Sequence, residues 1–421
     1  MTQAADGGAL TGAPPRPASP GRLTVVLLAV ACGLCVANLY YLQPILPDLA
    51  DSLDIRPESL TPALAATQLG YAAGLLALVP LGDVVDRRRL VSALVSCAGV
   101  ILAVIPLARG AALVALFLLL GLFSVAAMVI VPMAAGMAPA ERRGQIVGTV
   151  MTGVILGALL CRTFAGLIAG LADWRAVFWC GSAAMWAVLL LLRRTLPPPS
   201  GPGQPRLSVT GYLRLLRSVG TLLRHNSELA RRCLYGALGF GAFTVLWTAV
   251  PLRLAEPPYD FGASAIGLVG LLGAGGALGA NLAGRFADRG RSTAVSAVAF
   301  ALIAVSFAGV AAWESALLAM CAVIVLVDFA VQAAHITNQT AVFQKVEASE
   351  RSRVTTAYMT SYFAGGALGS ALMGPVWRNG GWPASALLGC AFGGLALALV
   401  LGHVLRTRNR PHHKGVPATD A

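Results

Sequence analysis

The chain has 421 residues and a formal net charge of +13, and 57% of its residues are hydrophobic against 12% charged. This composition, with a mean hydropathy of +0.75, excludes an ordinary soluble domain and predicts an integral membrane protein. The apolar runs are long and unbroken, whereas the strands of a membrane β-barrel would alternate. We therefore expect spanning helices of roughly 20 residues each.

Twelve apolar runs are long enough to cross a bilayer. They lie at residues 23–46, 59–81, 90–108, 112–136, 145–170, 175–192, 232–254, 264–284, 292–312, 315–340, 354–376 and 384–405. Residues 1–22 are rich in Pro, Gly and Ala and predict a disordered cytoplasmic tail, because the apolar run that follows is too long for a cleavable signal.

A polar segment at residues 194–231 divides the runs six to six. We expect one six-helix bundle over residues 23–193, a second over 232–405 and a cytoplasmic tail over 406–421. The second half of the linker predicts a helix with an apolar face, including Tyr212, opposite several arginines. Such a helix fits a position on an anionic membrane surface and equally fits a solvated connector.

The basic residues are distributed unevenly between the two sides of the membrane. If both termini are cytoplasmic, 25 of the 31 Lys and Arg residues lie on the inner side and five lie in outer loops. Because Lys and Arg favour the cytoplasmic side, this asymmetry predicts a multi-pass protein of the cytoplasmic (inner) membrane with both termini inside. The positive charge therefore indicates topology and gives no reason to expect a nucleic-acid partner.

One short motif occurs twice. "GDVVDRRR" follows the second apolar run and "GRFADRGR" follows the eighth, an offset of 202 residues. "RRGQIVGTVMTG" and "ERSRVTTAYMTS" align Met151 with Met359, an offset of 208. A duplicated six-helix unit explains both offsets.

With twelve runs, a central linker and this repeated motif, the whole chain resembles the major facilitator superfamily. The family's loop Gly-x-x-x-Asp-Arg-x-Gly-Arg-Arg is matched in part by both copies. The matching positions, with neighbouring arginines, are Gly82, Asp86, Arg87, Arg88 and Arg89 in the first copy and Gly284, Asp288, Arg289 and Arg291 in the second. The resemblance implies two pseudo-symmetric six-helix bundles and a cytoplasmic gate at these loops. From the residues alone, the arginines could instead only set topology.

The fifth run is similar to that of the drug/proton antiporter branch of the family. Gly144, Gly153 and Gly157 match the branch's spacing, while Cys161 and Arg162 replace two glycines. The resemblance implies export in exchange for protons. Glycines one turn apart also serve ordinary close helix packing, and the fourth run lacks the arginine common among the branch's exporters.

Two charged residues fall deep inside predicted spans: Arg162 and Asp328. A charge at a helix centre costs about 2.5–3.5 kcal/mol on insertion scales, so both should face a water-filled cavity or a partner. Steps of four, three and four residues place Asp328, Gln332, His335 and Gln339 on one helical face. That face could line an inward-opening cavity, or it could form a polar network that only stabilises packing.

These residues suggest a coupling scheme. Asp328 is a candidate carrier of a coupling proton, and His335, whose side chain ordinarily titrates near neutral pH, is a candidate relay. Arg162 keeps its charge, so it could bind an anion or pair with Asp328. If the two charges pair in one conformation, protonation of Asp328 would release Arg162. Asn38 and Tyr41 could face the same cavity, or the tyrosine could belong to an interfacial aromatic belt.

The sequence thus predicts a secondary active transporter of a small organic molecule, working by alternating access with proton-coupled export (antiport) as the first choice. Proton-linked uptake of a sugar or organic anion is the alternative, and a ligand sensor is a remote one. There is no phosphate-binding loop, nucleophile–base pair or metal-ligand constellation, so we expect no enzyme activity, no metal and no cofactor besides the proton. The expected partners are the substrate and the lipid bilayer, with a monomer as the default.

Overall fold

A computed structural model describes residues 20–195 and 209–408, except Asp288, Gly290, residues 312–315, Lys345 and residues 348–349. The described residues form helices and connecting loops, and ten helices among them are long and apolar enough to cross a membrane. One shorter apolar helix precedes them. Most of the predicted tails, residues 1–19 and 409–421, lies outside the described residues.

The first bundle, here called the N-half, contains eight α-helices. They are α1 (Arg22–Ala37), α2 (Leu46–Ser52), α3 (Thr61–Ala77), α4 (Arg87–Val104), α5 (Gly110–Phe123), α6 (Ala126–Met137), α7 (Arg143–Leu171) and α8 (Trp174–Thr195). Short 3₁₀ turns connect them: η1 (Pro57–Leu60), η2 (Val79–Asp83), η3 (Ile105–Leu107) and η4 (Ala140–Arg142). The fourth predicted span is thus two helices, α5 and α6, with a break at residues 124–125.

The first predicted span is shorter than expected. Its α-helix ends at Ala37, and residues 38–45 form a series of turns before α2 begins. Pro44 contributes to this break, because it has no backbone N–H and disfavours helical geometry at Gln43. Polar side chains in the turns thereby become available to the centre of the molecule.

The second bundle, here called the C-half, follows the linker helix α9 (Val209–His225). Its elements are α10 (Ser227–Ala255), α11 (Ala263–Val269), η5 (Gly270–Ala274), α12 (Gly275–Ala287), α13 (Ser292–Ala311), α14 (Leu317–Phe343) and α15 (Arg351–Arg408). The last two predicted spans are the arms of α15, which bends at Gly381, where φ is 54° and ψ is −142°. Glycine adopts this left-handed backbone without the penalty of a Cβ atom.

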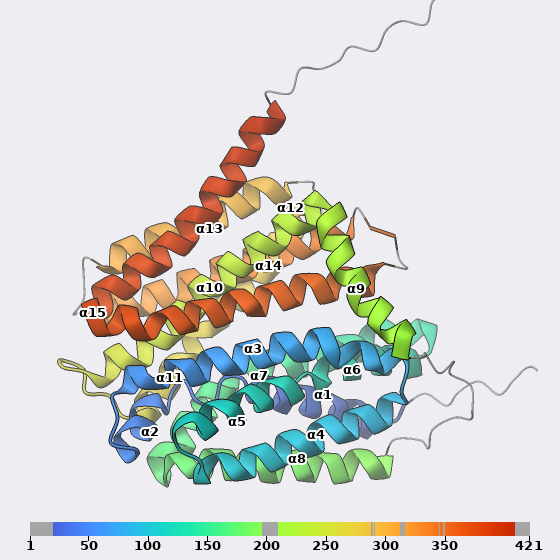
Figure 1. Cartoon of the computed structure of the whole chain (residues 1–421), viewed down its shortest axis with the longest axis horizontal. Coiled ribbons are helices and arrows are strands. Elements are labelled where there is room, and N and C mark those ends of the chain that lie inside the picture. Colours follow the sequence, from blue (N-terminus) through green and yellow to red (C-terminus); the bar gives the residue numbers. More distant parts are fainter. Residues whose placement is uncertain are drawn as a thin grey trace, which may run out of the picture.

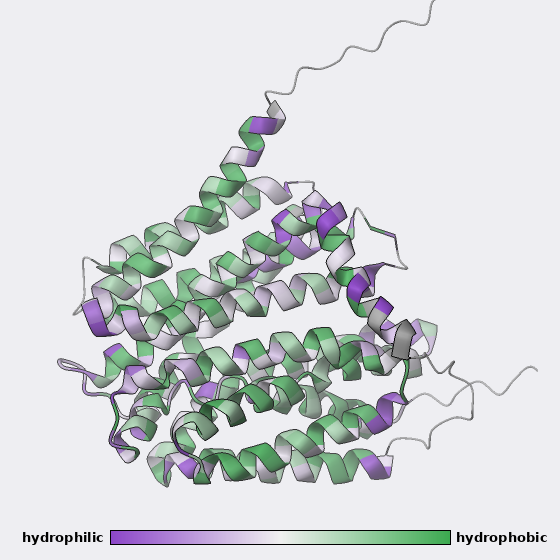
Figure 2. Ribbon diagram, viewed as in Figure 1, coloured by the Kyte–Doolittle hydropathy of each residue, from purple (hydrophilic) through white to green (hydrophobic). Residues whose placement is uncertain are grey.

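The two halves lie side by side (Figure 1), and α3 and α7 of the N-half contact α15 and α11 of the C-half. Helix α9 crosses one end of the bundles, which we call the linker end; α2 and the bend of α15 lie at the opposite, far end. Hydrophilic residues gather at the helix ends and on α9, whereas the middle of the bundles is hydrophobic (Figure 2). This is the expected pattern for a protein that spans a membrane.

Candidate functional site

Arg162 and Asp328 lie near each other at the interface between the halves. Arg162 is on α7 with 5% of its surface exposed, and Asp328 is on α14 with 3% exposed. The indole of Trp247 on α10 connects them: its Nε1 donates to Asp328 Oδ1 at 3.2 Å, and its ring lies 4.2 Å from Arg162 Cζ. In the described structure the two charges form no direct ion pair within 4.0 Å, so Trp247 mediates their contact.

The guanidinium of Arg162 stacks between two aromatic rings. Its Cζ lies 4.5 Å from the ring centroid of Tyr40 and 4.2 Å from that of Trp247. Its Nε donates to Gln43 Oε1 at 2.7 Å and its Nη1 to the carbonyl of Ala158 at 3.1 Å. Cation–π contacts of this kind stabilise a desolvated guanidinium by about 2 kcal/mol. The remaining nitrogen, Nη2, is buried without a partner.

Asp328 faces a break in the eighth membrane-spanning segment. That segment consists of α11, the 3₁₀ turn η5 and α12, and a Cβ atom on Gly273 of η5 would lie 3.3 Å from Asp328 Oδ2. A Cβ on Gly270 would lie 2.8 Å from Arg162 Cβ. The glycines therefore leave room for both charged side chains, and Asp328 Oδ2 remains buried without a hydrogen-bond partner.

The other residues of the predicted polar face, Gln332, His335 and Gln339, follow Asp328 toward the linker end and are half-buried. Gln332 packs against Gly276, and the His335 ring lies 4.6 Å from that of Tyr362. The Tyr358 hydroxyl is 3.3 Å from His335 Nδ1, and Gln339 Nε2 lies 3.5 Å from Met359 Sδ. The face is thus buried at Asp328 and more accessible toward the linker end.

Asn38 and Tyr41 face different neighbours. Asn38 Nδ2 donates to Ser124 Oγ at 3.1 Å, at the break between α5 and α6. Tyr41 lies against α8, where a Cβ on Gly181 would be 3.2 Å from Tyr41 Cε2. Of the two tyrosines in the turns after α1, Tyr40 is the one that stacks on Arg162, and Gln43 from the same turns accepts a hydrogen bond from Arg162. Tyr40, Gln43 and Trp247 were not among the predicted site residues; the one signal for the first two was Pro44 after a polar stretch.

The repeated loop motif is described in full only in its first copy. Asp86 Oδ1 accepts from the backbone N–H of Arg89 at 2.9 Å and so caps α4. Arg87 Nε donates to the Gly82 carbonyl at 3.0 Å, and Arg88 Nη2 to the Arg193 carbonyl at 2.6 Å.

In the second copy, Gly284 lies in α12 and Arg289 Cζ lies 5.9 Å from the Phe286 ring. Arg291 immediately precedes α13, and Asp288 lies outside the described residues. The structure therefore shows the aspartate as a helix cap in the first copy only.

The glycines of α7 have different surroundings. A Cβ on Gly153 would lie 2.1 Å from the Ala29 carbonyl oxygen, and one on Gly157 would lie 2.3 Å from the Gly33 carbonyl oxygen. These two positions let α7 approach α1 closely. Nothing lies within 4 Å of the equivalent position on Gly144, so it takes no part in this contact.

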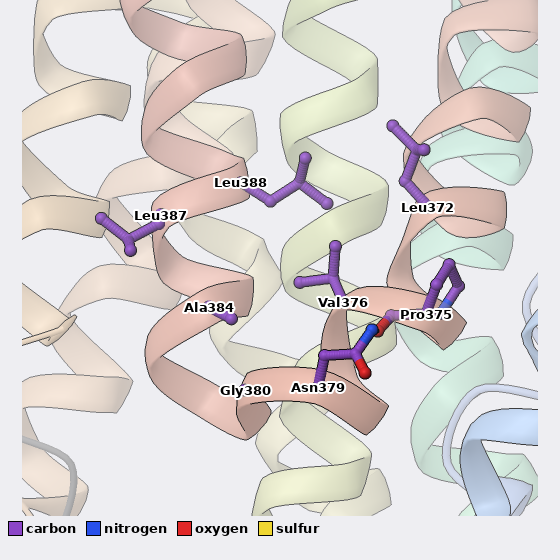
Figure 3. A pocket seen from close by; sticks show the side chains of 8 residues that line it. All are labelled: Leu372, Pro375, Val376, Asn379, Gly380, Ala384, Leu387 and Leu388. Atoms are coloured by element: carbon purple, nitrogen blue, oxygen red, sulfur yellow. The ribbon is translucent and has the colours of Figure 1, made fainter.

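Two grooves lie away from the charged pair. One, of about 610 Å³, lies between the arms of α15, and its polar side chain, Asn379, donates to the Pro375 carbonyl (Figure 3). The other, of about 730 Å³, lies along α1, α7 and α8 and is lined mainly by apolar residues. Neither contains a charged side chain. Among the described residues, no group of three or more His, Cys, Asp or Glu side chains is placed to hold a metal ion.

Two helical bundles with buried charges at their interface define a multi-pass membrane transporter. The chain belongs to the Major Facilitator Superfamily, whose family model matches residues 28–370 and 259–421. It is 41% identical over 377 residues to the "Uncharacterized transporter YgaY" of Escherichia coli O157:H7, covering 89% of this chain and 93% of that protein. It is 36% identical over 363 residues to the "Probable transporter SCO4007" of Streptomyces coelicolor, covering 86% and 83%.

Solved transporters have a similar fold. A bacterial homologue of the human lysosomal transporter Spinster, in an inward-facing and occupied conformation, gives a TM-score of 0.72 with 14% identity over 94% of this chain and 98% of that one. The nucleoside transporter NupG gives a TM-score of 0.70 with 14% identity over 91% and 99%. The predicted fold class, two six-helix bundles of the major facilitator type, is confirmed.

Proposed function

We propose that the protein is a proton-coupled exporter that exchanges a small organic molecule for protons across the cytoplasmic membrane. The linker end faces the cytoplasm in this proposal, because most of the basic residues lie in the loops and tails assigned to that side. The antiporter-like glycine spacing of α7 supports export. The observation that carries the proposal is the meeting of Arg162 and Asp328, from opposite halves, around one indole.

The charge state of Asp328 affects the whole cluster. An ionised carboxylate accepts a charge-assisted hydrogen bond from Trp247, and protonation weakens that bond. Arg162 stacks on the same indole. Protonation of Asp328 therefore weakens the positioning of the ring that holds Arg162, the charged residue of the other half. Protonation can in this way change the relative stability of two arrangements of the halves.

Contacts between the halves support a pathway that is closed near the far end. Near the far end, Thr163 Oγ1 donates to the Gly267 carbonyl at 2.9 Å, and Ser264 Oγ donates to the Gly166 carbonyl at 3.3 Å. A Cβ on Gly166 would lie 2.3 Å from the Ala263 carbonyl oxygen. Toward the linker end the polar face of α14 is more exposed. This arrangement supports substrate entry from the cytoplasm, with separation of α7 and α11 needed for release outside.

The free Nη2 of Arg162 favours a second candidate, proton-linked uptake of an organic anion. Everted membrane vesicles with an acidified lumen distinguish the two functions. A panel of aromatic amines, carboxylates, zwitterions and uncharged compounds is added outside, and lumenal pH is followed with a fluorescent probe. Exchange predicts that at least one compound raises the lumenal pH, and that vesicles with Asp328→Asn do not respond. If no compound releases protons, the export proposal is wrong.

A further inference from the structure

We propose that the site between Arg162 and Asp328 selects an aromatic zwitterion, a ligand with one negative and one positive group and no net charge. This inference rests on the proposed transport function and specifies its substrate class. Its basis is the pair of buried polar atoms that the protein leaves unpaired, one on each charged residue.

The two atoms are complementary to opposite charges. Arg162 uses Nε and Nη1 within the protein, so Nη2 is the nitrogen left to donate to a ligand. Asp328 uses Oδ1 for Trp247, so Oδ2 is the oxygen left to accept. Each residue is more than nine-tenths buried, and buried polar groups normally have partners. A ligand carboxylate would accept from Nη2, and a ligand ammonium would donate to Oδ2.

The broken eighth segment places both charges beside one wall. Gly270 and Gly273 are three residues apart in the 3₁₀ turn η5, where residues i and i+3 lie on the same side. Gly270 faces Arg162 and Gly273 faces Asp328 Oδ2. Gly276 continues this side toward Gln332, with a would-be Cβ 2.9 Å from Gln332 Cγ. Glycine backbone therefore lies against the aliphatic part of Arg162, against Asp328 Oδ2 and against Gln332, which lies on the more accessible part of α14.

The charge balance of the site disfavours a ligand of one sign. When Asp328 is ionised its charge cancels that of Arg162, and both side chains are buried. A simple amine or a simple carboxylate would add an uncompensated charge at low dielectric, which is unfavourable. A zwitterion supplies one charge to each partner and leaves the site neutral.

Aromatic rings supply a surface for the apolar part of the ligand. Phe243 is half-buried, lies 5.8 Å from Arg162 Cζ and is 6.3 Å from Trp247 between ring centroids. Phe240 stacks on it at 5.2 Å and on Tyr362 at 4.1 Å. A row of rings thus extends from the charged pair toward His335, and Phe243, its half-buried member, is the ring on which an aromatic ligand can stack.

The proposal also explains exchange with protons, because the ligand's ammonium and a proton compete for the same carboxylate. Two of the elements that face Asp328 contribute no charged group that could take the place of the proton or the ammonium. These are α10, with the neutral Trp247, and η5, with glycine. The titratable or charged side chains around Asp328 are Arg162 of α7, Tyr40 of the turns after α1, Tyr362 of α15 and His335 on α14 itself. Arg162 stays charged, so occupancy of Asp328 by a proton leaves the site positive and no longer matched to a zwitterion.

Two matched triads test the inference with purified protein in detergent and isothermal titration calorimetry. One contains phenylalanine, phenethylamine and 3-phenylpropanoate; the other contains 4-(aminomethyl)benzoate, benzylamine and benzoate. In at least one triad we expect the zwitterion to bind about ten-fold tighter than both analogues. With Arg162→Gln its affinity should fall to that of the amine, and with Asp328→Asn to that of the carboxylate. If neither triad favours its zwitterion, or no member binds, the inference is wrong.

A third variant keeps both charged residues. Any effect it has on binding therefore cannot come from misfolding caused by the loss of one buried charge. Gly273→Ala adds a methyl group beside Asp328 Oδ2, so it should weaken binding of the zwitterion and the amine but leave the carboxylate unchanged. Equal weakening of all three would contradict the proposed site. The binding experiment needs no pH gradient, so loss of proton exchange with retained zwitterion preference would overturn only the proposed function. Proton exchange with amines alone would support the function and overturn the inference.

Discussion

The first and fifth membrane helices cross through close glycine contacts in both halves, and the fifth helix of the N-half also carries the buried Arg162. In the N-half, Gly153 and Gly157 of α7 approach the carbonyls of Ala29 and Gly33 on α1. In the C-half, Cβ atoms on Gly365 and Gly369 of α15 would lie 2.1 and 2.4 Å from the carbonyl oxygens of Ala237 and Gly241 on α10. Ala29 and Ala237, and likewise Gly33 and Gly241, are separated by the repeat offset of 208 residues, whereas the glycines that contact them are separated by 212, one helical turn more.

The charged residues do not follow this repeat. Adding 208 to Arg162 gives Ser370, and subtracting 208 from Asp328 gives Leu120; both are buried and uncharged. Close backbone packing is needed wherever these helices cross, so it is present in both halves. The charges meet at a single place between the halves. The comparison therefore separates residues that build the scaffold from residues that we expect to act in transport.

The largest effect should come from blocking the two crossings. Gly157→Val and Gly365→Val each place side-chain atoms where a carbonyl oxygen already lies, and overpacking costs about 1–3 kcal/mol even where neighbours can shift. We expect both variants to lose thermal stability and monodisperse yield by similar amounts, measured by thermal melting and size-exclusion chromatography in detergent. Gly144→Val, with open space around it, is the matched control. Full stability of either crossing variant would refute its scaffold role.

Asp328→Asn should abolish proton-coupled transport while the protein stays folded. The asparagine carbonyl can still accept from Trp247, but the side chain cannot bind and release a proton. In everted vesicles we expect substrate-induced proton release to fall to the background of empty vesicles. Leu120→Ala, at the repeat-related position, should retain proton release when compared at equal amounts of folded protein. Wild-type exchange by the Asp328→Asn variant would show that another group carries the proton.

Arg162→Gln should reduce transport by about ten-fold or more, because the charge-assisted contact with the ligand is lost. Ser370→Ala, at the repeat-related position, should change transport by less than about two-fold. Both rates are measured as initial rates of proton release at equal protein amounts. Similar losses in the two variants would mean that Arg162 acts through packing, as Ser370 would.

Trp247→Phe should give the smallest effect, a reduction of a few-fold. Phenylalanine retains a ring on which Arg162 can stack but has no N–H to donate to Asp328. We expect the transport rate to depend less steeply on pH than in the wild type, measured from pH 5 to pH 8. Trp247→Leu, which removes both contacts, should lower the rate further. An unchanged pH profile in Trp247→Phe would argue against the connection through the indole.

Apolar runs and their repeats were sufficient to predict the fold class. Hydrocarbon thickness dictates the length of a spanning helix, and a duplicated motif reveals two related bundles, so both features can be read locally from the chain. Helical periodicity likewise put Asp328, Gln332, His335 and Gln339 on one face. The break after Ala37 was not predicted, because the leucines and isoleucine of residues 38–46 extend the apolar run, and only the polar residues and Pro44 between them marked the change.

The sequence by itself determined that this is a twelve-span membrane protein and that Arg162 and Asp328 are its unusual intramembrane charges. These conclusions need only composition, length and spacing, because the cost of a charge in hydrocarbon applies wherever the residue lies along the chain. Only the tertiary structure decided that the charges meet around Trp247, with Tyr40, Gln43 and the glycines of η5 beside them. The two charged residues and these partners come from five separate segments, and their proximity depends on helix crossings and local breaks that no short stretch of sequence specifies.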